Sequence, residues 1–312
     1  MQHITDTMID TLVSPEDAQR VLLDAFRSFG DGAAAMQERI RTEAGGVKLS
    51  TLGAVIPGQG VAGAKVYTTI KGQFAFVILL FSSETGLPLA SFDANAITRL
   101  RTAACSVIAA RQLARPDARQ LTLFGAGVQG QEHARQMAAA FALERIRVYT
   151  PEEAPHLAAQ LSAQCGVPVE RFAAGETREA LRDADIIVTA SRSTTPLFAG
   201  EQLPEGCFIA AVGSSLPHTR ELDDVALERA AVVAVEWRPQ SLREAGDLVL
   251  AAPGVLPTHK VVELGELVSG RTILQRRPGD IAIYKTVGVG LEDIALAGLA
   301  WEHFLAKGRQ AH

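Results

Sequence analysis

Residues 121–130 read LTLFGAGVQG, and this stretch decides the fold of the larger part of the chain. Its first four residues are typical of a buried strand, and residues 131–141 have the composition of a helix. Between them lie three glycines in the pattern Gly-x-Gly-x-x-Gly. Gly125 permits a tight turn, Gly127 leaves room for a pyrophosphate, and Gly130 lets the helix pack closely on the strand. The stretch therefore predicts a strand, loop and helix that bind a dinucleotide.

The start of the predicted helix supplies the groups that bind the anion. The backbone amides of Val128 and Gln129 lie in its first turn, where unpaired N–H groups and the helix dipole favour a phosphate. A purely structural turn is the alternative interpretation. The strand, loop and helix around the glycines favour the nucleotide site.

The tip of the second predicted strand bears on the choice between NAD(H) and NADP(H). An acidic residue at this place binds the ribose 2′-hydroxyl of NAD, but here the sequence has Thr150, followed by Pro151. Thr150 has no charge to repel a 2′-phosphate, although no arginine directly follows it. Glu152 or Glu153 can still serve a ribose hydroxyl. We therefore expect NADP(H) or NAD(H), with a slight preference for NADP(H).

Apolar strands alternate with helices from residue 117 to residue 288. This alternation predicts a Rossmann-type doubly wound parallel sheet, and thus an α/β fold for the domain 117–288. The strand segments expected in this domain are 121–124, 146–149, 185–190, 208–212 and 231–235.

The beginning of the chain has a different pattern. Ser14 and Pro15 predict a helix start, and three short β-rich segments divided by turn signals predict an antiparallel meander over residues 65–92. A long helix then ends near Pro116, because proline cannot continue it. A final apolar helix begins near Gly290 and is expected to return to this part. The sequence thus predicts an α+β domain, residues 1–116 together with 289–312.

Composition excludes several classes of protein. The 312 residues are 47% apolar and 21% charged, and the net charge of −5 offers no basic surface for nucleic acid. The three cysteines, at positions 105, 165 and 207, lack metal-site spacing and leave one unpaired, which favours a reducing compartment. The N-terminus lacks signal-peptide features, and no apolar run is long enough to cross a bilayer. We expect a cytoplasmic protein without a membrane or nucleic-acid partner.

A series of short motifs in one order resembles the ornithine cyclodeaminase/μ-crystallin family over nearly the full chain. The motifs are Thr98-Arg99-Leu100-Arg101-Thr102-Ala103-Ala104, Leu113-Ala114-Arg115-Pro116, the glycine loop, Asp185-Ile186-Ile187-Val188-Thr189-Ala190, Ala211-Val212-Gly213, Glu244-Ala245-Gly246-Asp247, Glu263-Leu264-Gly265-Glu266, Lys285-Thr286-Val287-Gly288 and Glu292-Asp293. The resemblance implies a Rossmann domain, a second domain for substrate binding and dimerisation, and a homodimer. It also implies hydride chemistry at the α-carbon of small amino or imino acids.

The same resemblance assigns the site residues. It places the substrate carboxylate on Arg41, Lys65 and Arg101, which agrees with the need for cationic donors around a buried carboxylate. Arg99 lies on another side of the same predicted helix, so only one of the two arginines can face the site. The further residues assigned to the cofactor are Thr189, Val212, Gly213 and Thr286.

Ser215 marks a departure from the cyclodeaminase pattern. Cyclodeaminases of the family have an aspartate at this position, whereas a serine hydroxyl can bind an imine nitrogen but cannot act as an ionised base without an activating partner. The acidic residue that meets the distal amine of ornithine is also missing from the uncharged segment 52–57. We therefore predict NAD(P)H-dependent reduction of a cyclic imino acid such as Δ1-pyrroline-2-carboxylate to a proline-like L-amino acid, with Lys65 and Ser215 as catalytic residues.

Several alternatives stay open at this stage. They are an ornithine cyclodeaminase that releases ammonia, an alanine dehydrogenase, and a non-catalytic NADP-dependent binding protein of the μ-crystallin type. His218, near the expected chemistry, can relay a proton or simply face solvent. Histidine and cysteine spacings indicate no metal site, and no Gly-x-Ser-x-Gly motif indicates a hydrolase.

Overall fold

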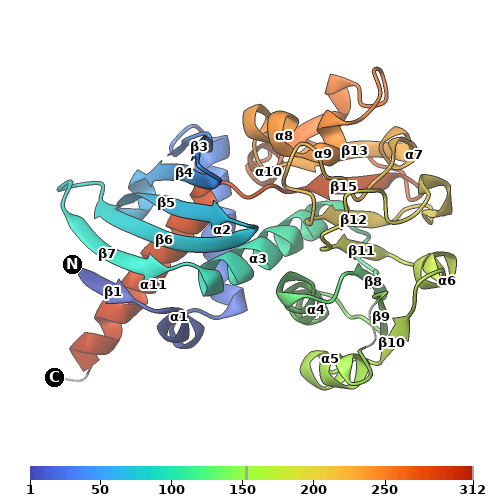
Figure 1. The fold of residues 1–312 in the computed structure, drawn as a ribbon, viewed down its shortest axis with the longest axis horizontal. Coiled ribbons are helices and arrows are strands. Elements are labelled where there is room, and N and C mark those ends of the chain that lie inside the picture. The colour runs from blue at the N-terminus through green and yellow to red at the C-terminus, as the bar shows by residue number, and fades with distance from the viewer. Residues whose placement is uncertain (152–153, 311–312) are drawn as a thin grey trace. The chain divides into compact units, whose positions relative to one another are not determined.

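The computed structural model describes residues 1–151 and 154–310, and the chain divides into two units (Figure 1). The first unit contains Met1–Cys105, Val268–Arg271 and the segment from Gly288 onward, and the second contains Ser106–Leu267 and Thr272–Val287. The division at Cys105 falls inside the long helix α3 (Asn95–Leu113), whereas the sequence predicted a boundary at residue 116.

A mixed sheet forms the centre of the first unit. Its strands run in the order β1-β7-β6-β5-β4-β2, with β3 also paired to β4. They are β1 (Gln2–Ile4), β2 (Ala35–Met36), β3 (Ile40–Ala44), β4 (Val47–Ile56), β5 (Val61–Ile70), β6 (Gln73–Ser82) and β7 (Pro88–Asp93). The pairs from β3 to β7 are antiparallel, which confirms the predicted meander.

One face of this sheet is buried by helices. The buried side chains alternate along the strands, as in Leu52, Ala54 and Ile56 of β4. The helix α11 (Gly290–Gln310) packs on β4, β5 and β6 (Figure 1) and also contacts α2. At its first residue a Cβ would collide with the backbone of Gly53, so glycine at position 290 allows this close approach.

Two helices precede the meander in the first unit. They are α1 (Asp6–Leu12) and α2 (Pro15–Gly30). Ser14 caps α2, since its hydroxyl accepts a hydrogen bond of 3.0 Å from the amide of Asp17, and Pro15 occupies the first turn. The predicted helix start is therefore confirmed.

The second unit is built on an eight-stranded parallel sheet with the order β10-β9-β8-β11-β12-β15-β13-β14. Its strands are β8 (Gln120–Phe124), β9 (Arg145–Tyr149), β10 (Val169–Phe172), β11 (Ile186–Thr189), β12 (Phe208–Ala211), β13 (Ala230–Val235), β14 (Val261–Glu263) and β15 (Ile281–Lys285). The reversal of strand order next to β8 is typical of the Rossmann type, and the predicted α/β fold class is confirmed.

The helices of this unit connect the parallel strands. They are α4 (Val128–Ala140), α5 (Leu157–Cys165), α6 (Thr177–Leu181), α7 (Asp224–Arg229), α8 (Arg238–Glu244), α9 (Gly246–Val249) and α10 (Leu264–Val268). Central strands such as β11 and β12 are buried along their whole length, which explains their continuous apolar sequence.

The sequence did not predict every strand. The strands missed are β1, β2, β3, β4, β10, β14 and β15. β1, β10 and β14 lie at edges of the two sheets, where strands are short and partly polar, as in Val169-Glu170-Arg171-Phe172. Within the described residues, no helix has the length and apolar character needed to cross a membrane.

Candidate functional site

The glycine loop in the second unit has the geometry of an anion-binding turn. Gly125 has a φ of 98°, and a Cβ there would lie 2.6 Å from the carbonyl oxygen of Ala190. A Cβ on Gly130 would collide with the carbonyl of Gly125, so helix α4 can pack on β8 only with glycine at position 130. At Gly127 a Cβ would meet no atom within 4 Å. This open space fits the approach of a pyrophosphate, as the sequence predicts.

The start of α4 is free to bind an anion. Gly127 is its N-cap, and within the described part of the chain no side chain caps this end. The first-turn amides of α4, such as that of Val128, point toward the loop, where the helix start favours an anion. The donors present fit a dinucleotide phosphate.

A cavity of about 990 Å³ lies against this loop, within the second unit. Gly125, Gly127 and Thr150 line it, in agreement with their predicted role in cofactor binding. The volume falls in the upper range of small-molecule sites. Further lining residues that the sequence analysis did not identify are Gln131, Tyr149, His156, Gln160, Ser191, Arg192 and Ser193. Three of these, Ser191 to Ser193, follow the carboxyl end of β11, where ligands of open α/β sheets bind.

The other predicted cofactor residues do not line this cavity. Val128 is exposed at the start of α4, and Gln129 and Gly130 follow it in the helix. Val212 and Gly213 continue β12, and their amides donate to the carbonyl of Thr189 at 2.8 and 3.1 Å. The acids Glu152 and Glu153, considered for the ribose hydroxyl, lie outside the described residues.

Glu221 joins the loops that follow β11 and β12. One carboxylate oxygen accepts hydrogen bonds from the Thr189 hydroxyl and the Gly213 amide, both at 2.8 Å. The other accepts from the amide and the hydroxyl of Ser191 at 2.7 and 2.6 Å. Glu221 is fully buried, and all these partners act as donors to it. The hydroxyl of Thr189 is thus already engaged, which makes Thr189 a support of the loop.

Asp247 and Lys285 extend this buried network. The carboxylate of Asp247 accepts from the amides of Glu221 and Leu222 at 2.6 and 2.8 Å. Its other oxygen lies 2.8 Å from Nζ of Lys285, which also donates to the carbonyl of Ala211 at 3.1 Å. Motif residues far apart in the sequence therefore hold the carboxyl edge of the sheet in one arrangement.

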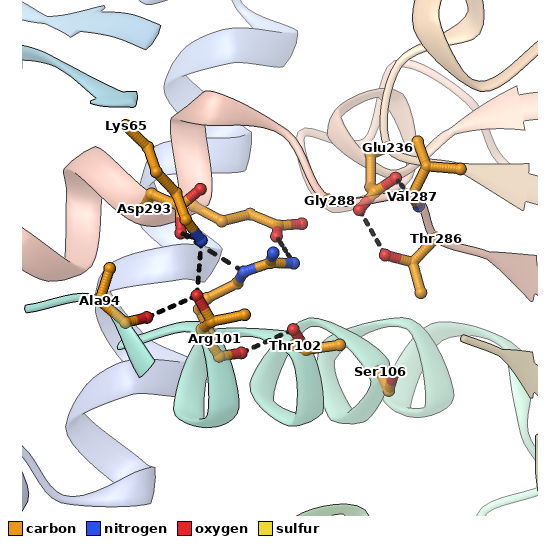
Figure 2. Close-up of polar contacts among 12 residues, drawn as sticks. Lys65, Ala94, Arg101, Thr102, Ser106, Glu236, Thr286, Val287, Gly288 and Asp293 are labelled. Carbon is orange, nitrogen blue, oxygen red and sulfur yellow. Dashed lines mark hydrogen bonds and ion pairs between the residues drawn. The ribbon is translucent and has the colours of Figure 1, made fainter. Parts of the chain in front are cut away.

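Thr286 has a similar supporting contact. Its hydroxyl donates to Glu236, whose other oxygen accepts from the amide of Val287 at 2.8 Å (Figure 2). Thr286 and Glu236 are both buried. Thr286 was predicted to contact the cofactor, but its hydroxyl is engaged by Glu236 and fixes the chain directly after β15.

Lys65 and Arg101 meet in the first unit, as the sequence predicts (Figure 2). Nζ of Lys65 lies 3.1 Å from Oδ1 of Asp293 and 2.5 Å from the hydroxyl of Thr98. Nη1 of Arg101 donates to Glu292 at 2.6 Å, and its Nε lies 3.6 Å from Asp293. β5, α3 and the first turn of α11 thus bring two cations and two carboxylates together in a buried cluster.

Burial changes the acidity of the lysine in this cluster. It lowers the pKa of Lys65 from 10.5 to about 8. The carboxylate of Asp293 opposes this change, while the positive charges of Arg101 and Arg39 reinforce it. An ammonium group that titrates near neutral pH can bind an anion and can also release a proton.

Arg39 belongs to this cluster and was missed by the sequence analysis, which chose Arg41. Arg39 donates a hydrogen bond of 2.6 Å to the carbonyl of Gly288, and its charge acts on Lys65. A Cβ on Gly288 would lie 2.6 Å from Nη2 of Arg101, so both guanidinium groups approach the same glycine. In the strand register Arg41 lies opposite Ser50, and Lys65 lies opposite Leu52. Ser50 comes two residues before Leu52 in β4, so Arg41 is displaced from Lys65 by one same-face position.

An irregularity in the strand explains why Arg39 could not be identified from the sequence pattern. Met36 pairs with Ala54 and Ile40 pairs with Thr51, so four steps along one strand match three along the other. The extra residue between them forms a bulge, which redirects side chains and breaks the simple alternation. The direction of the Arg39 side chain cannot be predicted from alternation alone.

Ser215 and His218 lie in the loop after β12. Ser215 is partly exposed, and His218 is exposed on the surface. The described residues contain no group of three or more His, Cys, Asp or Glu side chains arranged to hold a metal ion.

Residues 1–308 match the ornithine cyclodeaminase/mu-crystallin family. The chain belongs to this family. The resemblance identified from the motifs is confirmed, and the match covers both units.

Two curated relatives of the family are similar to this chain. A protein named Delta(1)-pyrroline-2-carboxylate reductase from Bacillus cereus is 34% identical over 85% of this chain and 79% of its own length. The mouse protein named ketimine reductase mu-crystallin is 34% identical over 72% of this chain and 68% of its own length.

Solved structures of the family share the fold. A probable ornithine cyclodeaminase from Bordetella pertussis is 60% identical with a TM-score of 0.95, covering 98% of each chain. The Delta(1)-pyrroline-2-carboxylate reductase of Thermococcus litoralis, in complex with NADH and L-proline, is 27% identical with a TM-score of 0.92, covering 99% of this chain and 98% of that one. An archaeal alanine dehydrogenase dimer with bound NAD is also 27% identical, with a TM-score of 0.90 over 99% and 97%. The reductases and the alanine dehydrogenase among these relatives confirm the predicted class, an NAD(P)-dependent oxidoreductase.

Proposed function

We propose that this family member reduces a small cyclic imino acid, such as Δ1-pyrroline-2-carboxylate, to the L-amino acid with NAD(P)H. The observation that carries the proposal is the buried cluster around Lys65. The named relatives that reduce pyrroline-2-carboxylate or ketimines support it.

The charges of the cluster favour a monoanionic substrate. Lys65, Arg101 and Arg39 bring three positive charges to two carboxylates, Glu292 and Asp293. A substrate carboxylate balances the excess, and in a buried site such a balance contributes strongly to binding. Arginine and lysine supply the donors that a carboxylate requires.

Asp293 is the group of the first unit that we assign to the substrate nitrogen. Oδ2 of Asp293 is buried and has no hydrogen-bond partner among residues 1–151 and 154–310. A buried carboxylate oxygen without a donor is costly, so a substrate N–H is a favourable partner. Ser215 supplies a hydroxyl that can bind the same kind of nitrogen. A protonated Lys65 can hold the carboxylate or give its proton to the developing amine.

When bound, the reduced nicotinamide supplies the hydride that the imine carbon accepts, and a proton completes the amine. The described lining of the cavity includes Arg192 and His156 and contains no carboxylate. Nη2 of Arg171, from β10, donates to the carbonyl of Thr150 at 3.4 Å. Arg171 next to Thr150 favours a 2′-phosphate, as does Arg192 in the lining, and we therefore propose a preference for NADP(H).

Two measurements test this function. Purified protein is mixed with Δ1-pyrroline-2-carboxylate and either NADH or NADPH, and nicotinamide absorbance is followed while the product is identified by chiral chromatography. Cofactor oxidation with formation of L-proline supports the proposal. Tighter binding of NADH than of NADPH in a fluorescence titration would contradict the cofactor preference.

Ornithine cyclisation is the second candidate, because the Bordetella pertussis structure at 60% identity is called a probable ornithine cyclodeaminase. Ammonia release from L-ornithine without net cofactor oxidation distinguishes it. That result, together with no turnover of Δ1-pyrroline-2-carboxylate, would overturn the reductase proposal. The serine at position 215 and the uncharged segment 52–57 make this outcome the less favoured one.

We also propose that the chain forms a homodimer through the sheet of the first unit. The face opposite α11 exposes apolar side chains, namely Ile40, Leu49, Val55, Val77 and Phe81. A hollow of about 480 Å³ lies on this face between β2, β4, β5 and Phe81. Exposed apolar surfaces of this kind are typical of interfaces, and the archaeal alanine dehydrogenase relative is a dimer. Sedimentation of the wild type and of a Val77→Lys variant tests it: an unchanged dimer, or a monomeric wild type, would contradict this interface.

A further inference from the structure

Three aromatic side chains gather at one end of the β5–β6 hairpin. The ring centroid of Phe76 lies 5.1 Å from that of Tyr67 and 5.5 Å from that of Phe74, which stacks on it in parallel. Phe74 is 56% exposed, whereas Phe76 is partly buried. The cluster thus has an inner ring, Phe76, and an outer ring, Phe74.

The inner ring contacts the substrate cluster. Nζ of Lys65 lies 4.5 Å from the centroid of Phe76, within the range of a cation–π interaction. The register explains this contact, since Lys65 pairs with Ile78 while Tyr67 pairs with Phe76, the next same-face position along both strands. The ring of Phe76 and the carboxylate of Asp293 therefore approach the same ammonium group.

We propose that Phe76, supported by Tyr67, is a specificity-determining wall of the substrate site that selects a flat, ring-closed imino acid over an open-chain one. This inference rests on the proposed function, because it places the substrate carboxylate at Lys65. It adds a pair of residues that neither the motifs nor the charged cluster assign.

Distance limits where the rest of the substrate can lie. Since Nζ of Lys65 lies 4.5 Å from the Phe76 centroid, a carboxylate held by Lys65 at hydrogen-bond distance can place its α-carbon against the Phe76 ring. The imine of a five- or six-membered ring is coplanar with its carboxylate and its neighbouring carbons, so it can lie flat against an aromatic face. A protonated imine also carries the positive charge that a ring face attracts. An open-chain imine has fewer carbons to place against the ring.

The test compares two substrates in matched variants. Phe76→Leu keeps an apolar side chain but removes the flat face, while Phe74→Leu makes the same change on the outer, exposed ring. We expect Phe76→Leu to lower the ratio of kcat/KM for Δ1-pyrroline-2-carboxylate to that for the open-chain imine of pyruvate and methylamine by about fivefold. Phe74→Leu should leave the ratio unchanged. An equal loss of kcat/KM on both substrates in Phe76→Leu, or the same shift of the ratio in Phe74→Leu, overturns the proposed role of Phe76.

Binding separates this inference from the proposed function. Calorimetric titration of the full chain with pyrrole-2-carboxylate, a flat ring bearing a carboxylate, and with pyruvate requires no turnover. The preference for the ring compound should fall about fivefold in Phe76→Leu and persist in Phe74→Leu. If the wild type reduces no imine, the proposed function fails. The titration still tests whether Phe76 selects a flat ring compound. Equal preferences in the wild type and in Phe76→Leu overturn this role of Phe76.

Discussion

Nζ of Lys65 lies 3.1 Å from Oδ1 of Asp293, and the two side chains are only 3% and 0% exposed. Burial lowers the pKa of Lys65 to about 8, and the negative charge of Asp293 keeps it from falling further. The pair therefore controls whether a cation is present at the proposed carboxylate site in the physiological pH range.

We expect kcat/KM for imine reduction to fall as pH rises above about 8. Below this pH Lys65 is protonated and can hold the carboxylate or donate a proton, and above it the neutral amine can do neither. A pH profile of kcat/KM checks this. Lys65→Arg, which stays charged, should lose the alkaline limb, whereas an identical limb in this variant would assign it to another group.

Asp293→Asn should move the alkaline limb to lower pH. The carboxylate raises the pKa of Lys65 against the effect of burial, so its neutralisation lowers that pKa further. The shift is measured from the same profiles, with near- and far-ultraviolet circular dichroism to confirm an intact fold. A limb that moves to higher pH would show that Asp293 does not act on Lys65 in this way.

Arg39→Ala should weaken substrate binding more than Arg41→Ala does. Arg39 reaches Gly288 and acts on Lys65, whereas Arg41 pairs with Ser50 further along the sheet. Loss of a charge-assisted hydrogen bond corresponds to a roughly tenfold to 100-fold decrease in kcat/KM. Steady-state kinetics of both variants provide the comparison. A larger effect of Arg41→Ala would restore the assignment made from the motifs.

Two glycine substitutions in the nucleotide loop should have different effects. Gly127→Ala adds a methyl group where the protein leaves open space, so it should weaken NAD(P)H binding with little change in the melting temperature. Gly130→Ala places a methyl group against the carbonyl of Gly125 and should lower both cofactor affinity and stability. Fluorescence titration and thermal denaturation measure the two quantities. Normal NAD(P)H affinity in Gly127→Ala would argue against the pyrophosphate at this position.

Glu221→Gln should destabilise the second unit and weaken cofactor binding. The amides of Ser191 and Gly213 donate to different carboxylate oxygens at 2.7 and 2.8 Å, so the single NH2 group of glutamine would face one of these two donors in either orientation. An unsatisfied buried donor costs about 1–3 kcal/mol. Chemical denaturation gives the free energy of unfolding, with the exposed Glu201→Gln as control. Equal stability of the two variants would remove Glu221 from this supporting role.

The sequence by itself determined the nucleotide-binding half of the fold. Gly125 has a positive φ and Gly130 packs against the carbonyl of Gly125, so both glycines meet requirements that are local in the chain. The buried strands β8, β11 and β12 can also be recognised in the sequence, because their residues are mainly apolar. Short edge strands such as β10 and β14 escaped prediction because runs of four and three residues are too short to show a pattern.

Only the tertiary structure decided which charged groups meet. Lys65 and Asp293 are separated by 228 positions, and their pairing depends on how α11 packs on the sheet. The bulge before β3 likewise decides that Arg39 reaches Gly288, since an extra residue changes side-chain direction in a way that the sequence pattern does not reveal. Local conformational preferences depend on neighbouring residues. Which charged side chains become partners depends on packing between segments that are distant in the chain.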